Sequence, residues 1–226
     1  MTEEVARQRA AIVAAGRRLG ARGLISAGEG NVSARLADGM LLTTPTGRRK
    51  DELAAEDILV IPMDPDEPVA VGPLPSTDIP IHRAVYAARF DVWAVVHAHL
   101  PAAMALTLAG EVPDPGALPE TALLLPRLPF VPYGTPGSDE LAVRVAAAFV
   151  TEDEPLPGAV LLERHGAVAV GATVEQAVNR LELVEVLCRT WRDALLIRAA
   201  VATDGARAIL RPSSPRPGTP ARGRTQ

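Results

Sequence analysis

The chain has 226 residues, enough for one domain with a substantial core. Apolar residues make up 48% of it and charged residues 22%, which excludes a disordered protein, and a net charge of −4 excludes the basic surface that nucleic-acid binding requires. No apolar run approaches the roughly 20 residues of a membrane span, and the acidic N-terminus does not have the pattern of a signal peptide. The single cysteine, Cys188, can form no disulfide within the chain. We therefore expect a cytoplasmic protein.

The first sixty residues are predicted to form a helix followed by strands. Residues 3–19 carry apolar side chains at helical spacing. A glycine-containing loop then enters a strand over residues 24–36, a turn follows at 37–39, and residues 40–44 return as a second strand. The remaining predicted elements here are a turn at 45–47, a short helical turn at 53–57 and a buried strand at 58–61.

The rest of the chain alternates between helices and strands. The residues Ser76-Thr77-Asp78 open a helix that continues to Ala88, because hydroxyl and carboxylate side chains cap helix starts and Pro80 suits the first turn. The later predicted elements are a strand at 92–99, a helix at 101–108, a proline-rich ordered loop with short strands at 110–136, a helix at 138–150, strands at 159–162 and 167–170, and a helix at 173–202. The helix–strand alternation and the hairpin at 37–39 together predict a mixed or antiparallel sheet layered with helices.

The C-terminal segment differs in composition from the rest. Residues 211–226 are dominated by Pro, Ser, Gly, Arg and Thr, a composition typical of disorder. We therefore predict one domain over residues 1–210 and a disordered tail over 211–226.

Three of the four histidines lie at predicted strand ends or turns. His97 and His99 are two residues apart, so a strand places both rings on one face, and His165 lies in a turn between two apolar strands. Catalytic zinc sites use three protein ligands and keep one open position. The pattern therefore indicates a metal site at His97, His99 and His165, although ordinary hydrogen bonding of each ring stays an open alternative. His82 lies within a helix, and there a packing or hydrogen-bonding role is favoured.

Asp78 is the candidate catalytic carboxylate, because it lies in the first turn of a helix near the candidate metal site. A carboxylate beside a metal can move a proton to or from a carbon acid, whereas a carboxylate at a helix start can also simply interact with the helix dipole. Both interpretations stay open from the residues alone.

The start of the same helix also suits an anion. Free N–H groups and two hydroxyls, from Ser76 and Thr77, make a natural phosphate site, and nearby turns could contribute Asn31, Thr46 and Gly47. Each of these residues alone is weak support, because turns commonly use them anyway.

Several short segments occur together in a characteristic order. They are Gly30 to Arg35, Leu42 to Gly47, Pro75 to Asp78 with His82 and Tyr86, Val95 to His99, Pro132 to Gly134, and His165 to Ala167. Over about residues 5–200 this combination resembles the class II aldolase/adducin family, and within it the aldolases that cleave L-fuculose 1-phosphate. No single segment is specific, but the combination is.

The resemblance implies an α/β fold, a three-layer α/β/α sandwich around a central, mainly antiparallel sheet, in a C4 homotetramer with active sites at subunit interfaces. It implies zinc, with Mn²⁺ or Co²⁺ as possible replacements, on His97, His99 and His165. It further implies that the substrate phosphate is held by Asn31, Thr46, Gly47, Ser76 and Thr77.

Two departures from the family pattern concern the catalytic groups. Asp78 stands where the family usually has its catalytic glutamate, and is shorter by one methylene. The segment 112–119, where the aldolases carry a tyrosine acid donated by a neighbouring subunit, contains no tyrosine.

The expected activity is zinc-dependent, reversible cleavage of a ketose or deoxyketose 1-phosphate, such as L-fuculose 1-phosphate, to dihydroxyacetone phosphate and an aldehyde, with Asp78 as the proton-transfer residue. Lys50, the only lysine, follows two arginines near a turn, where we expect too little desolvation for a Schiff-base amine. The alternatives are a metal-dependent decarboxylase, dehydratase or epimerase of the same fold, and a non-catalytic, adducin-like interaction module.

Overall fold

The computed structural model describes residues 3–68, 72–152 and 154–209. Its internal contacts divide the chain into a unit of Met1–Arg192 and a unit of Asp193–Gln226. The described part of the second unit, residues 193–209, is helical. The predicted tail, 211–226, lies outside the described residues, so the predicted domain boundary stays a prediction. Within the described part of the chain, no helix combines the length and the apolarity needed to cross a membrane.

A seven-stranded sheet forms the centre of the first unit, in the order β3-β2-β1-β4-β7-β6-β5. All neighbouring strands are antiparallel except β5 and β6, which are parallel. The strands are β1 (Asn31–Arg35), β2 (Met40–Thr43), β3 (Leu59–Pro62), β4 (Ala94–Ala98), β5 (Phe130–Val131), β6 (Ala159–Leu162) and β7 (Gly166–Gly171). The predicted strands are therefore confirmed, with shifts of one or two residues at several ends.

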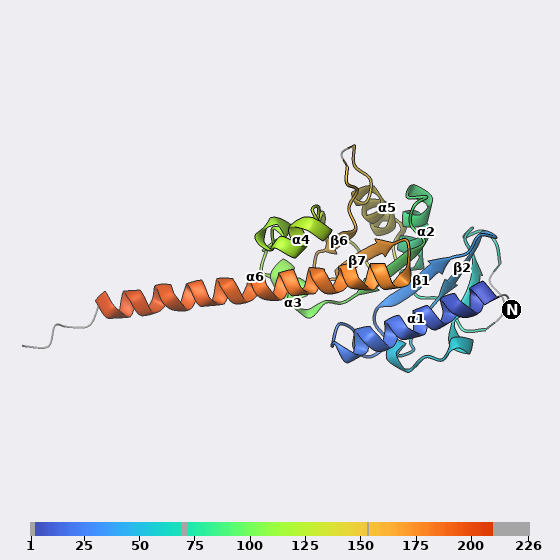
Figure 1. Ribbon diagram of the computed structural model, residues 1–226, viewed down its shortest axis with the longest axis horizontal. Coiled ribbons are helices and arrows are strands. Elements are labelled where there is room, and N and C mark those ends of the chain that lie inside the picture. The colour runs from blue at the N-terminus through green and yellow to red at the C-terminus, as the bar shows by residue number, and fades with distance from the viewer. Residues whose placement is uncertain (1–2, 69–71, 153, 210–226) are drawn as a thin grey trace, which may run out of the picture. The chain divides into compact units, whose positions relative to one another are not determined.

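Helices cover both faces of this sheet (Figure 1). On one face, α2 (Ile79–Ala88) and α5 (Asp139–Ala148) pack on a core that includes Val85, Val95 and Val168. On the other face lie α1 (Glu3–Ala21), α3 (Pro101–Leu108) and the part of α6 (Val174–Ile209) that belongs to the first unit. The expected α/β/α sandwich with a mainly antiparallel sheet is thus confirmed.

The structure differs from the sequence prediction mainly in the proline-rich stretch 110–136. That stretch contains a short 3₁₀ helix, η3 (Pro115–Ala117), and a helix, α4 (Pro119–Leu124), which the prediction treated as loop. Pro119 occupies the first helical position, where a missing N–H costs nothing. The predicted helical turn at 53–57 is present as the 3₁₀ helix η2 (Ala55–Asp57), and a second 3₁₀ helix, η1 (Lys50–Glu52), precedes it.

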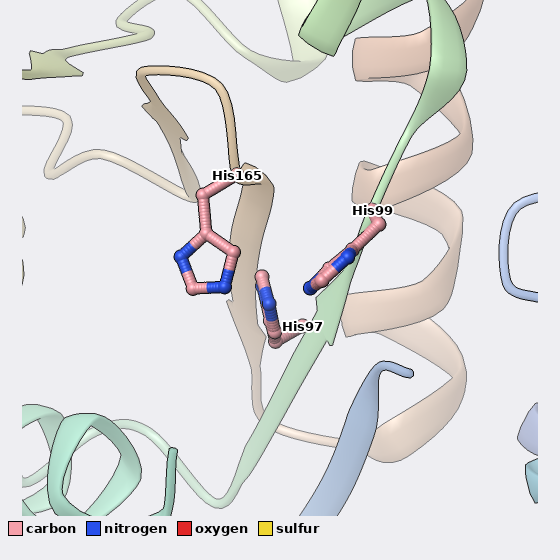
Figure 2. Close-up of side chains that lie close together, drawn as sticks. All are labelled: His97, His99 and His165. Atoms are coloured by element: carbon pink, nitrogen blue, oxygen red, sulfur yellow. The ribbon is translucent and has the colours of Figure 1, made fainter. Parts of the chain in front are cut away.

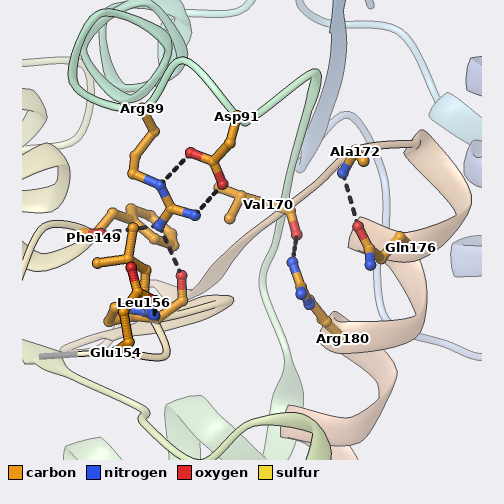
Figure 3. Close-up of polar contacts among 10 residues, drawn as sticks. Arg89, Asp91, Phe149, Glu154, Leu156, Val170, Ala172, Gln176 and Arg180 are labelled. Carbon is orange, nitrogen blue, oxygen red and sulfur yellow. Dashed lines mark hydrogen bonds and ion pairs between the residues drawn. The ribbon is translucent and has the colours of Figure 1, made fainter.

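One end of the sheet is tied together by arginines (Figure 3). Arg89 forms an ion pair with Asp91 at 2.6 Å and donates to the carbonyls of Phe149 (3.0 Å) and Pro157 (3.2 Å). Arg180 donates to the carbonyl of Val170 at 2.7 Å. These contacts join α2, the loop after α5, β7 and α6 at the end where β4 begins. The opposite end of β4, at His97, is left for the candidate site.

Candidate metal centre

The three histidines predicted to bind metal come together in the structure (Figure 2). His97 is in β4 opposite Asn31 of β1, His99 follows the end of β4, and His165 lies in the turn between β6 and β7. Their ring centroids are 4.7 Å (His97–His165), 4.8 Å (His99–His165) and 5.0 Å (His97–His99) apart. Residues that are nearly seventy positions apart in sequence therefore form one cluster.

Two glycines allow the chain segments to approach this closely. Gly166 has φ +101°, and a Cβ there would lie 2.1 Å from the carbonyl oxygen of Ala98 and 2.8 Å from the Cα of His99. Gly30 has φ +71°, and a Cβ there would lie 3.0 Å from the carbonyl oxygen of His97. A side chain at Gly166 would push β7 away from the end of β4, whereas one at Gly30 would crowd the carbonyl of His97 and the side chain of Ile25.

The nitrogen atoms of this cluster suit a divalent cation. His97 Nδ1 bonds to the carbonyl of Ala167 at 3.0 Å, whereas its buried Nε2 has no hydrogen-bond partner. One ligand atom from each ring lies within 4.8 Å of the others, and tetrahedral zinc with bonds of about 2.0–2.1 Å needs only a modest contraction. Burial holds the pKa of His97 well below its usual value and lowers that of His165. Lowered pKa values favour the neutral form of these two rings, as metal ligation requires.

Asp78 faces this cluster rather than capping its helix. It occupies the N-cap position of α2 but makes no capping hydrogen bond with its side chain. Its Oδ2 instead accepts from Asn31 Nδ2 at 3.2 Å and lies 3.8 Å from His97 Nε2. The side chain is buried, and Oδ1 has no partner. This geometry favours the proton-transfer interpretation over the helix-dipole one.

The residues predicted to bind phosphate fall into two groups. Asn31 and Ser76 are buried and bonded to each other, with 2.9 Å between Nδ2 and Oγ, so both also fix Asp78. Thr46, Gly47 and Thr77 are exposed. The turn at Thr46 is held against the chain before α2, because the Thr46 N–H donates to the carbonyl of Leu74 at 2.9 Å. The structure thus brings the turn at Thr46 next to the segment that precedes α2.

Sequence reasoning missed Glu29. Its Oε2 lies 3.1 Å from Nδ1 of His99, and its Oε1 accepts from the N–H and hydroxyl of Ser26 at 2.8 and 2.7 Å. The only available signal was its place beside Gly30-Asn31 in a segment already singled out.

His82 has the role favoured from sequence. It is buried in α2, and its Nδ1 shares a 2.6 Å hydrogen bond with the hydroxyl of Ser33, which also bonds to the Tyr86 hydroxyl at 2.9 Å. Burial lowers the pKa of His82 to about 3 and raises that of Tyr86. This polar group joins α2 to β1 behind the candidate site.

The expectation that Lys50 lies in a poorly desolvated setting was wrong. Its side chain is buried, and desolvation lowers its pKa. Its ammonium donates to the carbonyls of Gly28 at 2.6 Å and Arg48 at 2.8 Å, and so joins the loop before β1 to the turn after β2. Because both carbonyls accept from the ammonium, Lys50 holds these two segments together.

Comparison with known proteins is consistent with this geometry. Residues 10–192 match the family described as Class II Aldolase and Adducin N-terminal domain. The chain is 34% identical to a methylthioribulose-1-phosphate dehydratase of Acidiphilium cryptum, covering 78% of this chain and 85% of that one. It is 36% identical to a 3-oxo-tetronate 4-phosphate decarboxylase of Cupriavidus necator, covering 75% and 76%. A solved L-fuculose-1-phosphate aldolase from Thermus thermophilus superposes with a TM-score of 0.74 at 31% identity, covering 86% and 97%.

Proposed function

The chain belongs to the class II aldolase and adducin family, and we propose that it cleaves a phosphorylated ketose, by reversible aldol cleavage of a ketose 1-phosphate such as L-fuculose 1-phosphate to dihydroxyacetone phosphate and an aldehyde. The three relatives described above are named as a dehydratase, a decarboxylase and an aldolase, all lyases, and this chain is an enzyme of that family. The observation that carries the proposal is the convergence of three histidines with a buried carboxylate 3.8 Å from one of them.

In this proposal His97, His99 and His165 hold the metal, for which we favour zinc over Mn²⁺ or Co²⁺. A divalent ion there supplies the Lewis acidity that neutralises negative charge developing on the substrate oxygens. A non-catalytic, adducin-like module would have no need for three converging imidazoles.

Asp78 is the proposed proton carrier. In the synthetic direction its carboxylate removes the proton from C3 of dihydroxyacetone phosphate, and in the cleavage direction it returns that proton to the carbon freed by bond breaking. Asn31 fixes the carboxylate by donating to Oδ2, while the unpartnered Oδ1 stays available as the base. The shorter side chain of aspartate is compatible with this role, since Asp78 already lies beside His97.

The phosphate group is proposed to bind Asn31, Thr46, Gly47, Ser76 and Thr77. Of these, Thr46 and Thr77 are exposed and are not used to position Asp78. Replacing both by alanine is therefore expected to weaken the binding of inorganic phosphate at least tenfold without changing metal content, as measured by calorimetry. Unchanged phosphate affinity would place the substrate anion elsewhere.

Decarboxylation or dehydration of a phosphorylated keto sugar is the second candidate. The specific observations that favour it are the aspartate at position 78 and the lack of a tyrosine in segment 112–119, where aldolases supply an acid for the departing oxygen. An epimerase of the same fold would share the histidines and Asp78.

We further propose, from the family resemblance, that the enzyme is a homotetramer, which light scattering would test.

The decisive experiment follows the C3 proton of dihydroxyacetone phosphate in D₂O with zinc-loaded protein. We expect exchange by the wild type and a loss of 10²-fold or more in Asp78→Asn, because a general base contributes about that much. The variant should keep its metal. If the wild type exchanges no proton and releases dihydroxyacetone phosphate from no ketose 1-phosphate, aldol cleavage is wrong. CO₂ release from 3-oxo-tetronate 4-phosphate would then identify the decarboxylase.

A further inference from the structure

Glu29 is a carboxylate that contacts a histidine of the cluster without belonging to it. It lies in the loop before β1, and its Oε2 is 3.1 Å from His99 Nδ1. Its other oxygen is held by both the N–H and the hydroxyl of Ser26. Both oxygens are thus engaged, so the carboxylate has one defined orientation.

The contact decides which nitrogen of His99 is available. A carboxylate at this distance favours the proton on Nδ1, where the N–H can donate a hydrogen bond to it, and so leaves the lone pair of the ring on Nε2. The carbonyl of Ala167 does the same for His97. Histidines that bind metals commonly donate their second nitrogen to a carboxylate or a backbone carbonyl, which fixes the ring and increases its basicity.

His99 needs such support more than His97 does. His97 is fully buried and lies within β4, where backbone pairing with β1 and β7 fixes its position. His99 lies beyond the last residue of β4 and is a quarter exposed. Among the described residues, Glu29 makes the side-chain contact that restrains its ring.

We propose that Glu29 is a positioning residue that orients His99 for the metal and raises metal affinity, with Ser26 holding Glu29 in place. This inference rests on the proposed function only in assuming that the histidine cluster binds a divalent cation. It does not depend on which lyase reaction the enzyme performs.

The test measures zinc affinity of the metal-free protein by competition with a chromophoric chelator at pH 7, without substrate. Glu29→Gln and Glu29→Ala are expected to bind zinc 10- to 100-fold more weakly, the usual loss when such a partner is removed. Ser26→Ala should show a smaller loss and Glu29→Asp a partial recovery. The matched control is Glu52→Gln, which changes an exposed carboxylate paired with Arg49 and should bind zinc like the wild type.

The stability of the metal-free proteins distinguishes a purely structural role of Glu29 from a role in orienting His99. If Glu29 acts through His99, metal-free Glu29→Gln should have the same urea midpoint as metal-free wild type. Its affinity for zinc should nevertheless be lower. The visible spectrum of the Co²⁺-loaded variant should also change, because one ligand is less well oriented. Zinc affinity within twofold of wild type, or a loss matched by a fall in metal-free stability, overturns the proposal.

Failure of the proposed function gives a different result. Wild-type protein that binds zinc tightly but neither exchanges nor cleaves any substrate contradicts the lyase reaction and leaves the Glu29 measurement valid. Wild-type protein that takes up no stoichiometric zinc contradicts both.

Discussion

His82 shows how a single buried side chain couples this fold to pH. Its pKa is about 3 in the folded protein because the ring is buried, against about 6.5 when unfolded. Between these two pH values the unfolded chain binds a proton at His82 and the folded chain does not. The free energy of unfolding therefore falls as the pH drops below 6.5.

We expect metal-free wild type to lose about 2 kcal/mol more than His82→Gln between pH 7 and pH 5, because one such group costs about 1.4 kcal/mol per pH unit. Urea unfolding at both pH values measures the difference. The comparison uses the change with pH, so the lower absolute stability of the variant does not enter. Equal losses in the two proteins would mean that His82 is protonated in the fold.

At the scale of elements, the β6–β7 turn positions the third histidine. Gly166→Ala combines a positive φ with a clash against the backbone at Ala98, whereas Gly39, in the β1–β2 turn, also has positive φ but open space around it. Gly39→Ala should therefore cost about 1 kcal/mol, from backbone strain alone. Gly166→Ala should cost at least 3 kcal/mol and also weaken zinc binding.

Chemical denaturation and chelator competition on the two variants give both quantities. Similar stabilities for Gly166→Ala and Gly39→Ala would show that β7 can move away from β4 without loss. Intact zinc binding in a destabilised Gly166→Ala would show that the turn does not set the position of His165.

Elements with a clear local pattern were predictable from sequence. The helix at 101–108 was correct at both ends, and the hairpin of β6 and β7 was correct within one residue, because apolar runs flank a polar turn. Helix α4 was missed because its six residues follow a run of prolines, and too few apolar positions exist there to show a helical period. Helix α6 continues to Ile209, beyond the predicted end at residue 202, and crosses Thr203, Asp204 and Gly205, residue types that do not favour helix and that local sequence therefore did not predict to continue it.

The candidate site was predictable only in part, for a physical reason. Strand alternation places His97 and His99 together, and an apolar hairpin brings His165 to the same sheet edge. Glu29 and Lys50 were missed because their partners depend on the paths of two loops. The carbonyl that Lys50 bonds, on Gly28, lies 22 residues away, and nothing in the local sequence indicates that contact.

At the scale of the whole molecule, a metal bound between β4 and the β6–β7 turn would join segments that are far apart in the sequence but neighbours in the sheet. Ligand that binds only the folded state stabilises it by about 4 kcal/mol at a thousand times its Kd. We expect chelation to lower the thermal midpoint by about 10 °C, since each kcal/mol shifts a chain of this size by about 2–4 °C. Scanning calorimetry before chelation, after it and after zinc is returned measures the effect.

His97→Ala provides the control for this measurement, because it removes a ligand and should make the midpoint insensitive to zinc. A wild-type midpoint that does not change with zinc would mean that the three histidines make no metal-dependent link across the sheet.

The burial of Lys50 has a practical consequence for observing local opening of the protein. It is the sole lysine of these 226 residues, and its amine is enclosed between the carbonyls of Gly28 and Arg48. An acylating reagent can therefore modify this side chain only when the two loops beside the histidines separate. The rate at which Lys50 gains the mass of one acyl group then measures how often the loops separate. A bound phosphate ester that bridges the loops should lower this rate.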